Sequence, residues 1–134
     1  MPFILDNSVA SGWFLENQST PYTEAIAARL HDDKALVPAL WELELANVLR
    51  TACLRQRMTA AQAQSVIGDF GLLPIEIDRT PTKPSEILAL ALRFGLSSYD
   101  AAYLELALRM QLPIATQDGP LHEAAIASGV GVVV

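Results

Sequence analysis

The sequence predicts an α/β fold of three layers, in which a central, mostly parallel sheet is flanked by helices. Two observations predict it. Short apolar runs alternate along the whole chain with longer segments in which apolar residues recur with helical spacing. Glycine, proline and helix-capping residues separate the two kinds of segment. Because the 134 residues contain no linker, repeat or change in composition, we expect a single domain over residues 1–134.

The expected strands are short, apolar and bounded by turn residues, which is typical of strands buried on both faces of a sheet. They span residues 3–5, 35–37, 74–77, 112–116 and 130–134. The last of them is β-branched at every position except Gly131, which favours extended backbone.

The expected helices begin at capping residues or prolines, and three of them end at glycines. They span residues 9–14, 21–30, 39–57, 59–70, 85–94, 98–110 and 121–128. Thr59 and Gln62 have the spacing of a capping box, and Gly71, Gly95 and Gly129 follow the last periodic residues of three of these helices. The longest helix, 39–57, is apolar nearly all round, which predicts burial on more than one side.

Charge and composition exclude several classes of protein. The net charge of −6, from 15 acids against nine Lys and Arg, has the wrong sign for a protein that grips long nucleic acid through its phosphates. No apolar run is long enough for a membrane span, and the N-terminus lacks the basic region of a signal peptide. One cysteine, Cys53, fits a reducing cytoplasm. A mean hydropathy of +0.29 suggests that a partner or a second copy covers part of the surface.

Two acids follow expected strands directly. Asp6 comes after the strand 3–5, with Ser8 beside it, and Asp118 comes after the strand 112–116. Ligands of parallel sheets bind outside the carboxyl ends of the strands, so both acids are expected at a binding site. The alternatives are local: Asp6 or Ser8 caps the next helix, and Asp118 with Gly119 makes a turn.

Three further acids lie on helices. Asp100 falls in the first turn of a helix that Ser97 or Ser98 can cap, and the alternative is an ordinary first-turn acid. Glu42 and Glu44 are two residues apart on the longest helix, so they point about 200° apart and cannot serve one site. An acid in so apolar a helix requires a partner or a cation, but the residues alone leave open which of the two faces a site.

Repulsion between these acids predicts a metal ion. Two carboxylates about 5 Å apart repel by about 3 kcal/mol at an effective dielectric constant of 20. If Asp6, one helical glutamate, Asp100 and Asp118 meet, either some of them are protonated or a divalent cation lies among them. A site of oxygen ligands without histidine or cysteine selects Mg²⁺ or Mn²⁺.

The order of these motifs resembles that of PIN-domain ribonucleases and, more narrowly, of the VapC toxins of bacterial toxin–antitoxin pairs. The resemblance spans almost the whole chain, and its most specific part lies in the last two motifs. The motifs are Leu5-Asp6-Asn7-Ser8, Pro38-Ala39-Leu40-Trp41-Glu42-Leu43-Glu44-Leu45-Ala46-Asn47, Ser98-Tyr99-Asp100-Ala101-Ala102-Tyr103 and Ala115-Thr116-Gln117-Asp118.

The resemblance implies a PIN-like fold and an acidic quartet of Asp6, Glu44, Asp100 and Asp118, which are the catalytic and metal-binding residues. Glu44 takes this role rather than Glu42 because the family's acid precedes an apolar-Ala-Asn step. Ser8 and Thr116 are implied as supporting polar groups, and Asp6 and Asp100 as direct metal ligands. Some relatives carry one more acid after the last motif, where this chain has Gly119-Pro120.

The implied activity is that of a Mg²⁺-dependent endoribonuclease that cuts structured RNA, often tRNA or rRNA, with metal-activated water. The implied protein is a homodimer whose site is covered by a cognate antitoxin. Arg50, Arg55 and Arg57 are candidates for RNA contacts, with a solvated helix end as the alternative.

Other folds that place an acid after a strand fit less well. A haloacid-dehalogenase phosphatase needs a second aspartate two residues after Asp6, where Ser8 stands, and a receiver domain needs a lysine after a late strand. The glycines at 129 and 131 lack the spacing of a dinucleotide site. The main alternative is a non-catalytic PIN-like module that binds RNA or protein.

Overall fold

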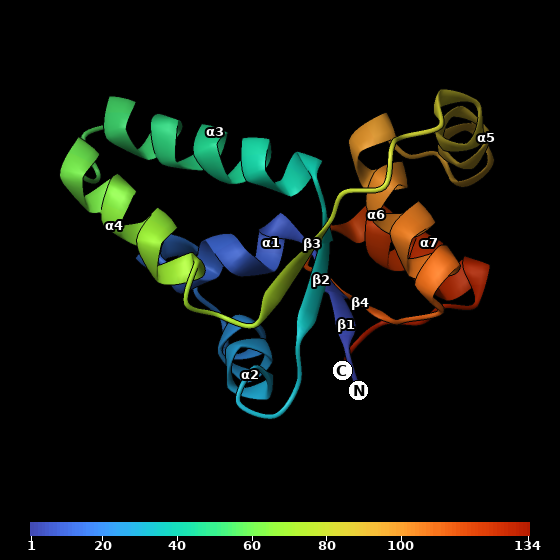
Figure 1. The fold of residues 1–134 in the computed structure, drawn as a ribbon, viewed down its shortest axis with the longest axis horizontal. Helices are drawn as coiled ribbons and strands as arrows, with labels where there is room; N and C mark the ends of the chain where they lie inside the picture. The colour runs from blue at the N-terminus through green and yellow to red at the C-terminus, as the bar shows by residue number, and fades with distance from the viewer.

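The computed structural model describes residues 1–134, and its centre is a sheet of four strands (Figure 1). The strands are β1 (Phe3–Leu5), β2 (Ala35–Pro38), β3 (Ile75–Asp78) and β4 (Ile114–Ala115). Their order is β3-β2-β1-β4, and every neighbouring pair is parallel. The carboxyl ends of all four strands therefore lie at one edge of the sheet.

Helices cover both faces of the sheet, which confirms the expected three layers (Figure 1). One face carries α1 (Asn7–Ala10), α2 (Pro21–Arg29), α3 (Leu40–Leu54) and α4 (Ala60–Phe70), and the other carries α5 (Pro84–Phe94), α6 (Ser98–Met110) and α7 (Gly119–Ser128). Two 3₁₀ turns, η1 (Ser11–Trp13) and η2 (Glu16–Gln18), follow α1. None of the helices combines the length and apolar composition needed to cross a membrane.

Helix α6 is fixed in the core. It packs against β1, β2 and β4, and Tyr103, Leu104 and Leu106 are fully buried. The strands β1, β2 and β4 are buried along their whole length, as their continuous apolar sequences predict. A polar side chain in the first turn of α6 is therefore held firmly relative to the strand ends.

The helix boundaries follow the capping chemistry in the sequence. Thr59 and Gln62 make both hydrogen bonds of a capping box, and Ser97 rather than Ser98 caps α6. Gly95 and Gly129 adopt left-handed φ angles of 66° and 89° at the ends of α5 and α7, where a side chain would be strained.

Three expectations were wrong in part. Residues 130–134 form a single bridge, Ile114 to Val132, instead of a strand, because Gly131 takes a φ of 80° that interrupts extended backbone. The first helix is one turn of α-helix followed by η1. Helix α3 ends at Leu54 and buries one side only, since it extends beyond the sheet beside α4 and leaves Leu43 and Leu54 exposed (Figure 1).

Candidate active site

Asp6 follows β1 and is buried at the carboxyl edge of the sheet, with 5% of its surface exposed. Its backbone N–H continues the pairing of β1 with β4 by donating to Ala115 O at 3.0 Å. Although Asp6 is the N-cap residue of α1, its side chain makes no capping hydrogen bond. Instead, its Oδ2 accepts hydrogen bonds of 2.7 Å from Ser8 Oγ and from Thr116 Oγ1. The carboxylate is therefore held from two sides, by α1, which follows β1, and by the loop that follows β4.

Asp118 is joined to Asp6 through Thr116. The Asp118 N–H donates to Thr116 Oγ1 at 3.0 Å, and Thr116 Oγ1 donates to Asp6. Asp118 also caps α7, since its Oδ2 accepts from Leu121 N–H at 2.9 Å. Helix capping thus explains the position of Asp118 and at the same time fixes its carboxylate near Asp6.

The two glutamates of α3 have different surroundings. Glu44 accepts a hydrogen bond of 2.5 Å from the hydroxyl of Tyr103, a fully buried residue one turn after Asp100 on α6. Glu42 points away and forms an ion pair of 2.9 Å with Arg79 after β3. The structure therefore places Glu44, and not Glu42, beside Asp6 and Asp100.

The acids Asp6, Glu44, Asp100 and Asp118, here called the acid cluster, lie close enough for their charges to interact. Burial, followed by the charges of Asp118, Asp6 and Glu44, raises the pKa of Asp100 to about 6. Burial raises the pKa of Asp6, and the charge of Asp118 adds to this although Ser8 and Thr116 oppose it. Burial and the charge of Asp6 also raise the pKa of Glu44, against the hydrogen bond from Tyr103.

No ion pair of the structure involves any member of the acid cluster. Its donor set consists of carboxylate and hydroxyl oxygens, which suits a hard divalent cation. No three of these side chains, however, already converge as metal ligands. Like charges that lack a cation favour separation, so the carboxylates must approach one another when an ion binds.

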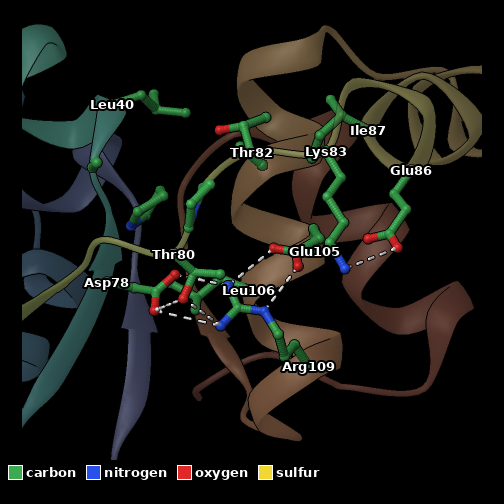
Figure 2. A pocket seen from close by; sticks show the side chains of 14 residues that line it. Leu40, Asp78, Thr80, Thr82, Lys83, Glu86, Ile87, Glu105, Leu106 and Arg109 are labelled. Atoms are coloured by element: carbon green, nitrogen blue, oxygen red, sulfur yellow. Dashed lines mark hydrogen bonds and ion pairs between the residues drawn. The ribbon is translucent and has the colours of Figure 1, made fainter.

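A second group of acids lies where α6 faces the segment between β3 and α5 (Figure 2). Arg109 Nη2 contacts Asp78, the last residue of β3, at 2.7 Å, and Arg109 Nε contacts Glu105 at 2.9 Å. These residues border a cavity of about 120 Å³ that contains no member of the acid cluster. Together with Glu42 and Arg79, they are called the ion-paired cluster.

Two residues of the site were not predicted as such from the sequence. Tyr103 lies three residues after Asp100, and this spacing puts both side chains on one face of the helix. The spacing is the sequence feature that could have identified Tyr103 as a residue of the site. Gln117 donates its backbone N–H to Ser8 Oγ at 2.9 Å and its side-chain N–H to Ser8 O at 3.1 Å. Nothing in the sequence distinguishes this glutamine from an ordinary loop residue.

Comparison with known proteins identifies the class to which this fold and site belong. Residues 3–127 match the family model of the PIN domain, so the chain is a member of the PIN domain family. It is 32% identical over 121 residues, 90% of each chain, to Ribonuclease VapC12 of Mycobacterium tuberculosis in strains CDC 1551 and H37Rv. It is thus a VapC-like PIN-domain protein.

The fold is also that of a solved structure, PAE2754 from Pyrobaculum aerophilum. The two superpose with a TM-score of 0.64, covering 92% of this chain and 84% of that one. Their sequences are 17% identical, so this similarity concerns the fold alone.

Proposed function

We propose that this protein is a metal-dependent endoribonuclease that hydrolyses a phosphodiester bond of structured RNA, such as tRNA or rRNA. The observation that carries the proposal is the acid cluster, in which four carboxylates share one edge of the sheet and none is paired with a basic side chain. Similarity to a protein named as a ribonuclease supports RNA as the substrate.

The ion proposed for the acid cluster is Mg²⁺, with Mn²⁺ as a possible substitute, because all the donors are oxygen atoms. Asp6 and Asp100 are proposed as direct ligands, with Glu44 and Asp118 completing the set. When bound, such an ion supplies a water of lowered pKa and positive charge beside the phosphate.

The residues of the chain orient the carboxylates for this chemistry. Ser8 and Thr116 donate to the same oxygen of Asp6, which leaves its Oδ1 free to face the ion. Tyr103 donates to Oε1 of Glu44, and burial raises the pKa of Tyr103, so the hydroxyl keeps its proton. The Asp118 carboxylate is held by its cap on α7. These hydrogen bonds restrict the carboxylates individually, which reduces the entropy lost when they close around the ion.

We also propose that the protein acts in the cytoplasm as the toxin of a toxin–antitoxin pair, as a homodimer neutralised by a cognate antitoxin. Exposed apolar side chains support a covered surface: Leu43 on α3 and Leu88 and Leu92 on α5 are 59–77% exposed. Light scattering of the purified protein should report a dimer mass. A monomer mass at micromolar concentration would reject the homodimer.

The activity is tested with purified tRNA and rRNA as substrates, in Mg²⁺ and in EDTA. Cleavage is expected only in Mg²⁺ and only without the substitution Asp100→Asn. Cleavage that persists in EDTA would reject the metal. RNA binding without any cleavage in Mg²⁺ or Mn²⁺ would instead support a non-catalytic binding module.

A further inference from the structure

A second polar recess lies along α3, away from the acid cluster. It is a cavity of about 180 Å³ between α3 and the segment that contains η2. Its polar lining is made of amides, a hydroxyl and two guanidinium groups, and it is called the α3 groove. These residues are Asn17, Gln18, Asn47, Thr51, Arg55 and Arg57.

Three lining residues of the α3 groove lie on the same face of the helix as Glu44. Asn47, Thr51 and Arg55 follow Glu44 by three, seven and eleven residues, so all four share a stripe of α3. At 1.5 Å per residue, Arg55 lies about 16 Å from Glu44 along the helix axis. This length corresponds to roughly five stacked nucleotides of one strand.

The arginines of the α3 groove are free to bind an anion. Of the nine Lys and Arg residues, five form ion pairs, namely Arg29, Lys34, Arg79, Lys83 and Arg109. The remaining four have no carboxylate partner, and two of these four, Arg55 and Arg57, line the groove. Two unpaired cations in one recess are a local exception in a protein of net charge −6.

The backbone at the end of α3 sets the position of Arg57. Gln56 adopts a left-handed φ of 57°, the Arg57 N–H donates to Ala52 O at 2.9 Å, and the Gln56 N–H donates to Cys53 O at 3.0 Å. This is a Schellman motif with glutamine where glycine is usual, and it turns the chain back so that Arg57 lines the same cavity as Arg55. The competing explanation is that both arginines only complement the dipole at the helix end.

We propose that the α3 groove holds one unpaired RNA strand on one side of the cleavage site, with Arg55 and Arg57 on its phosphates and the amides on its bases or sugars. The inference rests on the proposed ribonuclease function. A single strand is favoured over a duplex because the recess is small and its positive charge is confined to two residues, and because the net charge of −6 would oppose a second strand elsewhere on the protein.

The test compares two double variants of equal charge. Arg55→Ala/Arg57→Ala removes the groove cations, and Lys83→Ala/Arg93→Ala removes two cations at the ends of α5, outside the groove. Both are made in the Asp100→Asn protein with Mg²⁺ present, and binding of a fluorescein-labelled twelve-nucleotide single-stranded RNA is followed by anisotropy between 50 and 200 mM salt. A duplex of the same sequence is the second probe.

The groove variant is expected to weaken single-strand binding about tenfold and to reduce the slope of log K against log salt by about 1.4, which is two phosphate contacts at about 0.7 each. The control variant is expected to stay within twofold. Equal losses in both variants, or an equal loss for the duplex, would overturn the proposal. Arginines that only complement the helix dipole would give a different result: the groove variant would melt at a lower temperature and its RNA affinity would be unchanged. That result would also overturn the proposal.

Cleavage kinetics separate this inference from the function on which it rests. With Asp100 intact, the groove variant should raise KM about tenfold and leave kcat within twofold. Cleavage by the wild type with an unchanged KM in the groove variant rejects the groove and keeps the nuclease. Absence of cleavage by the wild type rejects the nuclease itself.

Discussion

The acid cluster and the ion-paired cluster both contain Asp and Glu carboxylates, but the pKa values of Asp6 and Asp78 are shifted in opposite directions. Asp6 follows β1 and Asp78 ends β3, so both lie at the carboxyl ends of parallel strands of one sheet, with β2 between them. The guanidinium of Arg109 lowers the pKa of Asp78, whereas burial and the charge of Asp118 raise the pKa of Asp6. The position at a strand end therefore does not define a metal site. We propose that the lack of a cationic side chain does, because buried carboxylates without one must either be protonated or bind an external cation.

The largest expected difference between the clusters is in catalysis. Asp100→Asn should reduce Mg²⁺-dependent RNA cleavage by at least about a hundredfold, because it removes a carboxylate that we propose as a ligand of the ion beside the reacting phosphate. Asp78→Asn, in the ion-paired cluster, should leave the rate within about twofold. Initial rates on labelled RNA measure both. Equal losses from the two substitutions would remove the distinction between the clusters.

The second difference is in stabilisation by metal. At a hundredfold excess over its dissociation constant, Mg²⁺ should stabilise the wild type by about 2.7 kcal/mol, because it binds the folded state only. Thermal unfolding in increasing Mg²⁺ measures this. The Asp78→Asn protein should be stabilised by Mg²⁺ as much as the wild type, and the Asp6→Asn protein should lose most of this stabilisation. No shift for the wild type up to millimolar Mg²⁺ would contradict a metal site.

Tyr103→Phe tests how the acid cluster is held. Phenylalanine fills the same buried volume but cannot donate to Glu44, and loss of a hydrogen bond to a charged group costs about 1.5 kcal/mol. We expect Mn²⁺ to bind about tenfold more weakly, as measured by calorimetry. The control is Tyr99→Phe on the exposed side of the same helix, where Tyr99 is 64% exposed and no change is expected. A Tyr103→Phe protein with wild-type Mn²⁺ affinity would show that this hydrogen bond is dispensable.

The dependence of stability on pH should have opposite signs in the two clusters. The pKa of Asp100 is raised from 3.8 to about 6, so without metal the folded state binds more protons than the unfolded state, and this contribution to stability is lost as pH rises from about 4 through 6. The lowered pKa of Asp78 gives stability that is lost as pH falls. In EDTA at pH 7, Asp100→Asn should be more stable than the wild type by about 1 kcal/mol, after allowance for solvent screening of a half-buried group. Chemical unfolding at pH 4 and pH 7 should show this difference disappearing at the lower pH; a constant difference would contradict it.

The smallest effect is expected at Glu42. Its ion pair with Arg79 is largely exposed, so Glu42→Gln should change neither the melting temperature measurably nor the cleavage rate by more than about twofold. Glu44→Gln is the matched substitution on the same helix, and it should reduce cleavage at least tenfold. If Glu42→Gln were the more harmful of the two, the assignment of Glu44 to the site would be wrong.

Much of the fold could be predicted from the sequence because its signals are local. The capping box at Thr59 and Gln62 and the glycines at 95 and 129 act within one helical turn, and each set a helix end as expected. The strand expected at 130–134 failed because Gly131 adopts a positive φ, a choice that glycine leaves open. The exposure of Leu43 and Leu54 could not be predicted either, since it depends on how far α3 extends past the sheet.

The sequence by itself determined that this chain is an α/β protein with acids after its strands, because apolar spacing and capping residues act over a few residues. Only the tertiary structure decided which acids acquire a basic partner. The difference between Glu42 beside Arg79 and Glu44 beneath Tyr103 depends on contacts made across 37 and 59 residues of chain. Electrostatic energy depends on distance in space, and no local pattern encodes it.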